Sequence, residues 1–388
     1  MHNIKLMNKI ASVGTDVFAG GDYHVSDAAE NPEGILVRSA SLHEMEFDPA
    51  LLGIARAGAG VNNIPIEACS QKGIVVFNTP GANANAVKEL AIASLFLASR
   101  DITGGVAWAK TLQGNADAAK LVEKGKSQFE GPELQGKKLG VIGLGAIGVM
   151  VANAAYGLGM EVYGFDPYIS ISAAWELSRH IIKAESLKAL CEVCDYITIH
   201  VPLNPSTKGY IGAETLDVMK DGVRVINLSR GEIVNNEAML AALTSGKVAK
   251  YVTDFPSAEV LEMPNTVCIP HLGASTPESE NNCAYMAAKQ LRDYIETGVI
   301  KNSVNLPNVD ALPDCRVRIC MIHANVPNMI SVLTTTLGDA HINIEHLTNQ
   351  SKKDMAYSIV DTNDDVPDSL IEKIQAAEGI IRVRKIVF

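Results

Sequence analysis

Residues 137–159 read KKLGVIGLGAIGVMVANAAYGLG, and this segment gives the clearest indication of the fold class. A short apolar run that is typical of a strand leads into the string GLGAIG at residues 143–148, and a helical pattern follows directly. Asp166 ends the next strand pattern, 18 residues after Gly148. A glycine-rich turn between a strand and a helix, with an acidic residue at the end of the following strand, is typical of a dinucleotide-binding fold.

Each residue of this fingerprint has a physical role. Gly143, Gly145 and Gly148 permit a tight turn, close approach of the backbone to a pyrophosphate, and close helix–strand packing. The first turn of the helix offers free N–H groups to the phosphates. Asp166 would accept hydrogen bonds from the adenosine ribose, and its charge would repel a 2′-phosphate. The fingerprint therefore predicts NAD as the cofactor, in preference to NADP.

Strand and helix patterns alternate over the first 300 residues, which predicts α/β domains with parallel sheets covered on both faces. Six strand patterns, the first of which leads directly into the glycine-rich turn, predict a Rossmann-type doubly wound sheet. They lie at residues 138–142, 161–165, 196–200, 224–228, 248–253 and 266–269. Earlier patterns predict a second, flavodoxin-like domain, with strands at 35–38, 54–57 and 74–77 and a helix at 64–72. A further helix is expected over 277–297.

Two stretches connect these domains. Residues 86–109 show a long apolar helical pattern with no turn signal before Gly104-Gly105, and we expect one helix that crosses between domains. Residues 110–133 are charged and weakly periodic, so we expect a solvated loop there.

The C-terminal part has a different pattern. The order of elements is βαββαβ in about 70 residues, which is typical of a ferredoxin-like domain; the elements are expected at 316–323, 328–339, 342–348, 356–360, 369–377 and 380–387. The expected domains are therefore 1–93 with 275–303, the NAD-binding domain 94–274, a linker 304–315, and the ferredoxin-like domain 316–388. A chain cut after Pro313 is expected to remain catalytically competent.

Composition excludes several classes of protein. The 388 residues include 33 Lys and Arg against 44 Asp and Glu, a net charge of −11, so the basic surface of a nucleic-acid-binding protein is not expected. No apolar run approaches the roughly 18–20 residues of a membrane span, and a cytoplasmic protein without a membrane partner is expected. The seven dispersed Cys predict reduced thiols. Cys191 and Cys194 form the single C-x-x-C, and because no second Cys pair or His pair at zinc spacing accompanies it, no metal site is expected.

Three segments at strand ends carry groups suited to chemistry. Asn227–Gly231 reads NLSRG, and the guanidinium of Arg230 matches a carboxylate. Pro270–Ala274 reads PHLGA, and the imidazole of His271 can move a proton near neutral pH. Asp254–Glu259 reads DFPSAE, and a carboxylate from this segment could orient that imidazole. Each of these residues taken alone also suits a structural role.

Taken together, the segments resemble the D-2-hydroxyacid dehydrogenase family, whose members carry N-x-[SA]-R-G, D-V-F-x-x-E-P and P-H-x-G-[GA] in this order after the fingerprint. The blocks Val37–Ala40, Arg56–Asn63 and Asn78–Gly81 are similar to those of the branch that oxidises D-3-phosphoglycerate. The C-terminal βαββαβ unit resembles the ACT regulatory domain. The resemblance extends over the whole chain.

The resemblance implies roles for individual residues. Arg230 would bind the substrate carboxylate and carbonyl oxygen, His271 would be the general acid/base, and Glu259 would be the partner of His271. The NAD site would be lined by Ala59, Gly143, Gly145, Ala146, Ile147, Gly148, Asp166, Val201, Leu228, Ser229, Arg230, Asp254, His271, Gly273 and Ala274. The substrate would be faced by Arg38, Ser39, Arg56, Gly58 and Asn83. An L-serine effector would contact His323, Asn325 and Asn343.

One departure from the family pattern concerns the acidic block. Residues 253–261 read TDFPSAEVL, and an ungapped alignment puts Ala258 where the family has its Glu. Glu259 is one position late and lacks the following Pro. Asp254 is therefore a competing partner for His271.

The resemblance implies NAD-dependent oxidation of D-3-phosphoglycerate to 3-phosphohydroxypyruvate, the first step of L-serine biosynthesis, in a homo-oligomer, either a dimer or a tetramer, that L-serine inhibits. Two alternatives stay open. One is a dehydrogenase of another 2-hydroxy acid such as 2-hydroxyglutarate. The other is a dinucleotide-sensing binding protein, although such a sensor would not need a group for proton transfer.

Overall fold

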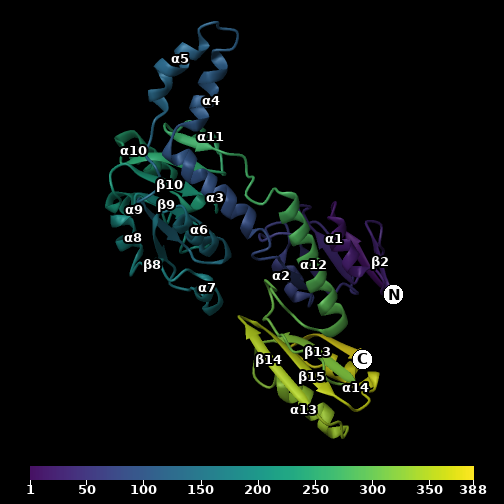
Figure 1. The fold of residues 1–388 in the computed structure, drawn as a ribbon. Coiled ribbons are helices and arrows are strands. Elements are labelled where there is room, and N and C mark those ends of the chain that lie inside the picture. Colours follow the sequence, from purple (N-terminus) through teal and green to yellow (C-terminus); the bar gives the residue numbers. More distant parts are fainter. The chain divides into compact units, whose positions relative to one another are not determined.

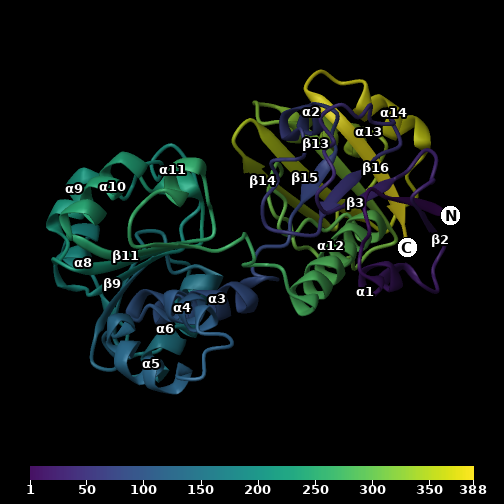
Figure 2. The same ribbon diagram turned by 90° about the horizontal axis from the view of Figure 1, so that it is seen from above.

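A computed structural model describes residues 1–388. The chain forms two compact units, whose elements can be followed in Figures 1 and 2. Unit 1 contains Met1–Asn83 and Glu280–Phe388, and unit 2 contains Ala84–Ser279.

Unit 2 is built on a parallel sheet of seven strands in the order β12-β11-β10-β9-β6-β7-β8. The strands are β6 (Lys138–Ile142), β7 (Glu161–Phe165), β8 (Ile182–Lys183), β9 (Tyr196–Ile199), β10 (Val223–Asn227), β11 (Val248–Thr253) and β12 (Thr266–Cys268). The expected doubly wound sheet is confirmed, with the short β8 as a strand that the sequence did not indicate. The strand order reverses between β6 and β9, and ligands of such sheets bind at the carboxyl ends beside this point.

Helices cover both faces of this sheet. Each face of the sheet has its own apolar core, and consecutive residues of β10 belong to different cores. Val225 packs on one face among Ile197, Leu190 and Tyr251. Ile226 packs on the opposite face among Leu139 and other residues. The helices of unit 2 are α3 (Ala84–Ser99), α4 (Ile102–Thr111), α5 (Ala118–Gly125), α6 (Ala146–Gly157), α7 (Ile171–Glu176), α8 (Leu187–Val193), α9 (Ala213–Val218), α10 (Asn236–Ser245) and α11 (Ala258–Leu261), with 3₁₀ turns η2 (Lys126–Phe129) and η3 (Gly231–Ile233).

The expectation of one continuous helix over 86–109 is wrong. The chain breaks after Ser99 and bends by 67° into α4, whose N-terminus is capped by Asp101 through the N–H of Gly104 at 3.3 Å. The loop expected over 110–133 in fact contains α5 and η2. Neither α4 nor α5 has a buried residue, and Figure 1 shows the pair standing off the sheet of unit 2.

None of the helices on its own combines the length and the apolar composition of a transmembrane span. Only the bent pair α3 and α4 reaches the required length and composition together, which buried core helices of other proteins also do.

The first part of unit 1 contains a parallel five-stranded sheet in the flavodoxin-like order β2-β1-β3-β4-β5, as expected. Its strands are β1 (His2–Leu6), β2 (Tyr23–Ser26), β3 (Gly34–Val37), β4 (Gly53–Arg56) and β5 (Val75–Phe77). Its helices are α1 (Ser12–Thr15), the 3₁₀ turn η1 (Asp16–Phe18), α2 (Ile66–Gln71) and α12 (Pro277–Thr297). The bounds of α12 are those that the sequence predicted.

The last part of unit 1 has the expected βαββαβ order, in an antiparallel sheet ordered β14-β15-β13-β16. Its elements are β13 (Val317–Ala324), α13 (Met329–Asp339), β14 (His346–Lys352), β15 (Met355–Thr362), α14 (Asp368–Gln375) and β16 (Ile380–Val387). The strand expected over 342–348 begins only at His346. The reason is that His341 adopts a left-handed conformation, φ +59°, and Ile342 donates to the carbonyl of Leu337, so this stretch terminates α13.

Both faces of the C-terminal sheet are covered. One face packs Ile319, Met321 and Val360 against α13 and α14. The other face packs Cys320, Ile322 and Tyr357 into one apolar core with Leu291 and Tyr294 of α12. Figure 1 shows the yellow C-terminal sheet beside the end of α12. The β13–β16 sheet therefore shares a hydrophobic core with the rest of unit 1.

Candidate active site

The glycine-rich turn between β6 and α6 leaves room for a ligand at one position only. Gly143 has φ +90°, and a Cβ there would lie 2.5 Å from the carbonyl oxygen of His200. A Cβ on Gly148 would overlap the carbonyl oxygen of Gly143, whereas a Cβ on Gly145 would meet no atom within 4 Å. The first and last glycines are thus required by packing, and the open side of Gly145, at the N-terminus of α6, fits a diphosphate.

Asp166, directly after β7, ties this turn to the next loop. Its Oδ2 accepts the N–H of Leu144 at 2.9 Å and its Oδ1 accepts the N–H of Tyr168 at 2.8 Å. A carboxylate offers about four lone-pair sites, so both oxygens keep capacity for ribose hydroxyls. This arrangement fits NAD.

We expect Asp166→Asn to weaken NADH binding and to reduce the preference for NADH over NADPH. The substitution removes the charge that would repel a 2′-phosphate but keeps one oxygen acceptor for the turn. Direct titration with both reduced cofactors measures the ratio of the dissociation constants. An unchanged ratio in a protein with the native Tm would show that another residue discriminates between the riboses.

The NLSRG segment after β10 is held by the buried side chain of Asn227. Its Oδ1 accepts the N–H of Ser229 at 3.1 Å, and its Nδ2 donates to the carbonyl of Arg230 at 2.9 Å. Ser229 Oγ in turn donates to the carbonyl of Ile199 in β9 at 2.6 Å. These bonds fix the main chain of Arg230, while its side chain is exposed and can meet an anion.

His271 follows β12 and shares a hollow of about 440 Å³ with Asp254. The imidazole is exposed and lies 4.8 Å from the ring of Phe255, centroid to centroid. Asp254 is only 1% exposed. Burial raises the pKa of the Asp254 carboxyl group, and the opposing influences are the charge of His271, the amides of Asp254 and Gly273, and the charge of Arg230.

Glu259 lies elsewhere. It is on the first turn of α11, which begins at Ala258 because Ser257 caps the helix through the N–H of Val260 at 3.3 Å. Its exposed carboxylate accepts from Nδ2 of Asn236 at 2.9 Å and does not line the hollow of His271. One residue turns a helical side chain by about 100°, so the one-position offset in the sequence changes where this carboxylate points.

The remaining NAD-lining candidates of unit 2 lie at the same edge of the sheet. They follow the carboxyl ends of β6, β9, β10, β11 and β12, which neighbour one another in the strand order. The structure thus gathers at one edge Ala146, Ile147, Val201, Leu228, Ser229, Asp254, Gly273 and Ala274.

His200 also belongs to this edge and was not indicated by the sequence analysis. Burial lowers its pKa to about 4, so the ring is neutral at pH 7. Its Nε2 lies 2.9 Å from Thr198 Oγ1, while its Nδ1 is buried without a hydrogen-bond partner. A polar residue that ends the apolar strand YITI is the signal that could have found it.

The substrate candidates of unit 1 follow β3, β4 and β5, again at carboxyl ends. Val37 and Arg56 are register partners, and Arg56 Nε donates to the carbonyl of Arg38 at 3.0 Å. Gly58 has φ +156°, which side chains rarely adopt, and a Cβ there would lie 2.6 Å from Arg56 Nη1 and would displace this guanidinium. The same edge carries Ser39, Ala59 and Asn83.

Sequence reasoning missed two residues that contact Arg38. Asn8 Oδ1 accepts the N–H groups of Arg38, Ser39 and Ala40 at 3.3, 3.1 and 2.8 Å. Glu280 Oε1 lies 2.6 Å from Arg38 Nη2. The two residues lie 30 and 242 positions from Arg38, so no local pattern connects them.

The three residues expected to bind serine are not gathered within one chain. His323 is buried, with Nε2 3.0 Å from Ser358 Oγ, and Asn325 donates from Nδ2 to the carbonyl of Lys353 at 3.0 Å. The main-chain N–H of Asn343 instead donates to Asp364 at 2.7 Å, beyond the other end of β15. Strand β15, from Met355 to Thr362, lies between these two positions and spans about 23 Å at about 3.3 Å per residue.

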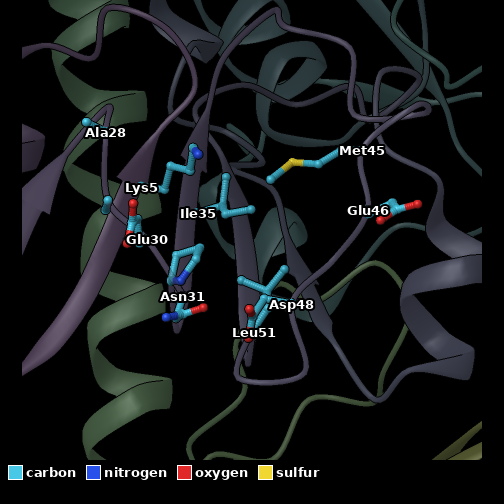
Figure 3. Close-up of a pocket in the computed structure, with 11 residues that line it drawn as sticks. Lys5, Ala28, Glu30, Asn31, Ile35, Met45, Glu46, Asp48 and Leu51 are labelled. Atoms are coloured by element: carbon cyan, nitrogen blue, oxygen red, sulfur yellow. The ribbon is translucent and has the colours of Figure 1, made fainter.

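A second hollow, of about 490 Å³, lies on unit 1 and contains none of the expected site residues. Its lining includes Lys5 and Ile35, from β1 and β3, and the acidic side chains of Glu30, Glu46 and Asp48; Figure 3 shows Glu30 near Lys5 and Glu46 apart from them.

Comparison with known proteins adds independent evidence. Residues 93–273 match the family described as D-isomer specific 2-hydroxyacid dehydrogenase, NAD binding domain. A D-3-phosphoglycerate dehydrogenase of Haemophilus influenzae is 31% identical over 367 residues, which are 90% of this chain and 85% of that protein. One of Methanocaldococcus jannaschii is 36% identical over 262 residues, 66% of this chain and 48% of that protein. The chain spans about half the length of several curated relatives that it matches.

Solved structures agree. The NAD⁺-bound 3-phosphoglycerate dehydrogenase of Entamoeba histolytica has a TM-score of 0.61 at 28% identity and covers 78% of this chain and 98% of that one. A glyoxylate reductase of Paecilomyes thermophila has a TM-score of 0.65 at 24% identity, with the same coverage, and supports the fold alone. The seven-stranded sheet therefore belongs to an NAD-binding domain, as the open side of Gly145 and the position of Asp166 indicate.

Proposed function

This chain belongs to the D-isomer specific 2-hydroxyacid dehydrogenase family, and from that premise we propose that it oxidises D-3-phosphoglycerate to 3-phosphohydroxypyruvate with NAD. The observation that carries the proposal is the group of side chains at one edge of the NAD-binding sheet. There an exposed guanidinium, Arg230, and an imidazole, His271, accompany the buried carboxyl group of Asp254.

The residues of unit 2 divide the chemistry. NAD supplies the hydride acceptor when it is bound. His271 accepts the proton of the C2 hydroxyl group as the C2 hydrogen leaves as hydride. Arg230 binds the carboxylate in a two-pronged geometry and stabilises the oxygen that becomes the carbonyl. In the reverse direction His271 returns the proton.

The choice of 3-phosphoglycerate rests on the cations of unit 1 and on the named relatives. Arg38 and Arg56 extend from neighbouring strand ends, and guanidinium groups suit a phosphate dianion. The relatives from Haemophilus influenzae and Methanocaldococcus jannaschii, and the solved structure from Entamoeba histolytica, are phosphoglycerate dehydrogenases by name.

The test is NADH formation, followed by absorbance, with D-3-phosphoglycerate, D-2-hydroxyglutarate and D-lactate as substrates. We expect the highest kcat/KM with D-3-phosphoglycerate. A higher value with 2-hydroxyglutarate would assign the protein to another 2-hydroxy acid. NAD binding without turnover of any hydroxy acid would favour the dinucleotide-sensing alternative.

We propose that Asp254, in preference to Glu259, is the partner of His271. Asp254→Asn is expected to move the acid limb of the pH profile of kcat/KM for oxidation to lower pH. The base must be neutral to accept a proton, and loss of the neighbouring negative charge makes the imidazolium less stable. The matched variant Glu259→Gln is expected to leave the limb in place, and the reverse pattern would return the role to Glu259.

We also propose that L-serine inhibits this activity through the C-terminal domain. Within a single chain, Asn343 lies far from His323 and Asn325. A site that contains all three residues therefore needs two copies of the chain, and hence a homo-oligomer, either a dimer or a tetramer. The assay is repeated with L-serine, together with calorimetry and sedimentation. Active protein that binds no serine would end the regulatory proposal and leave the catalytic one intact.

A further inference from the structure

One ion pair stands among the proposed phosphate-binding groups of unit 1. The Arg38 guanidinium contacts Glu280 through Nη2, 2.6 Å from Oε1, and the two side chains are 43% and 42% exposed. The main chain of Arg38 is held separately, because its N–H donates to Asn8 and its carbonyl accepts from Arg56. Glu280 therefore acts on the side chain of Arg38 and is not needed to place its backbone.

Glu280 is well placed to remain charged. It is on the first turn of α12, and the positive end of a helix dipole stabilises a carboxylate there. A half-exposed ion pair contributes little stability, so an arriving anion can compete for the guanidinium. Only Nη2 contacts Glu280, which leaves Nε and Nη1 of Arg38 for a second anion.

We propose that Glu280 is a specificity residue that weakens anion binding at Arg38 in proportion to the charge of the substrate tail. This inference rests on the proposed function, because it takes Arg38 to face the phosphate. A carboxylate beside the site repels a phosphate dianion about twice as strongly as a carboxylate monoanion, and it does not repel a neutral tail. Glu280 thus limits how tightly phosphorylated substrate and product are held.

The size of the effect follows from Coulomb's law. At about 6 Å in a water-like dielectric, each unit of tail charge changes affinity about 3-fold. Glu280→Gln is therefore expected to lower KM about 10-fold for D-3-phosphoglycerate, about 3-fold for D-2-hydroxyglutarate and not at all for D-2-hydroxybutyrate. kcat is expected to change less than 2-fold, and the KM effect is expected to shrink as salt is raised.

Two variants serve as controls. Glu278→Gln makes the same charge change on the same helix turn at a residue with no ion pair to Arg38, and we expect its KM ratios to be flat across the three substrates. Glu280→Asp keeps the charge and is expected to keep the native ratios. Inorganic phosphate as a competitive inhibitor gives a second readout, with a lower inhibition constant in Glu280→Gln.

Several outcomes would overturn the inference. KM values that fall equally for all three tails would mean a structural effect, and a KM that rises for D-3-phosphoglycerate would mean that Glu280 holds Arg38 in its binding position. If the native protein turns over 2-hydroxyglutarate but not 3-phosphoglycerate, the proposed function fails. The charge dependence can then still be tested with the monoanionic and neutral tails.

Discussion

His271→Ala is expected to lower kcat by about 10²–10⁴, the usual contribution of a positioned acid/base group. The variant would lose the proposed acceptor of the C2 hydroxyl proton, because no other imidazole lines the hollow of Asp254 and Phe255. NAD affinity should change little, since Gly145 and Asp166 hold the far end of the cofactor in the proposed arrangement. Steady-state rates and NADH titration measure the two quantities separately.

The matched control is His180→Ala, which removes an exposed imidazole from the same unit. That ring stacks on Tyr156, with centroids 5.0 Å apart, and has no part in the proposed site. It should leave kcat unchanged. Near-native turnover by folded His271→Ala would remove His271 from the mechanism.

The architecture of both parallel sheets could be predicted because it depends on short-range features of the sequence. Strand and helix periodicities, together with GLGAIG and the acidic residue that follows, are short-range features. The order of strands then follows from right-handed crossovers, which leave few topologies. The break between α3 and α4 was not predicted, because the only signal for it is the single N-cap residue Asp101, and the helical pattern of the sequence continues across the break.

The site could be predicted only as far as strand ends. Parallel strands bring their carboxyl ends to one edge, so the positions of Asp166, Arg230 and His271 follow from sequence. Which side chain then meets which depends on tertiary packing. Asp254 and Glu259 are five residues apart, but Asp254 lines the hollow of His271, whereas Glu259 lies on the first turn of α11 and contacts Asn236. The contact of Arg38 with Glu280 has no sequence signal at all.

The sequence analysis predicts that the C-terminal domain can be removed without loss of catalysis. The contacts at the end of α12 argue against this prediction. The last carbonyls of a helix have no partner within it. Here Arg384 Nη2 donates to the carbonyls of Tyr294 and Ile295 at 3.0 and 3.1 Å, and Tyr357 Oη donates to that of Gly298 at 2.7 Å. The side chains of the C-terminal sheet thus complete a helix of the parallel-sheet part.

Arg318 makes a further connection between the C-terminal sheet and the rest of unit 1. It is fully buried and forms two hydrogen bonds with Asp361, at 2.6 and 2.7 Å, while its Nη1 donates to the carbonyls of Thr297 and Ala311 at 2.8 and 2.7 Å. Gly298, with φ +75°, permits this close packing, because a Cβ there would overlap the sulfur of Cys320. The segment 304–315 is therefore anchored at Ala311.

Removal of residues 314–388 is consequently expected to unfold unit 1, with loss of activity and of the thermal transition of that unit, while unit 2 (Ala84–Ser279), which contains none of these residues, keeps its own transition. The cut would expose the apolar face of α12 and leave its terminal carbonyls without their donors. Circular dichroism and differential scanning calorimetry measure the loss. A truncated chain that melts cooperatively and keeps its kcat would restore the expectation of an independent tail.

A point variant tests the same connection in the full chain. Asp361→Ala leaves the buried guanidinium of Arg318 without its counter-charge and is expected to lower the free energy of unfolding by about 3–5 kcal/mol, because an uncompensated buried charge is costly. Lys289→Ala removes an exposed ion pair with Asp293 on α12 and should cost less than about 1 kcal/mol. Urea denaturation of both variants compares them directly. Equal and small losses would mean that the C-terminal sheet adds little to unit 1, whereas the expected difference would make this sheet part of the scaffold that supports the edge where Arg38 and Arg56 lie.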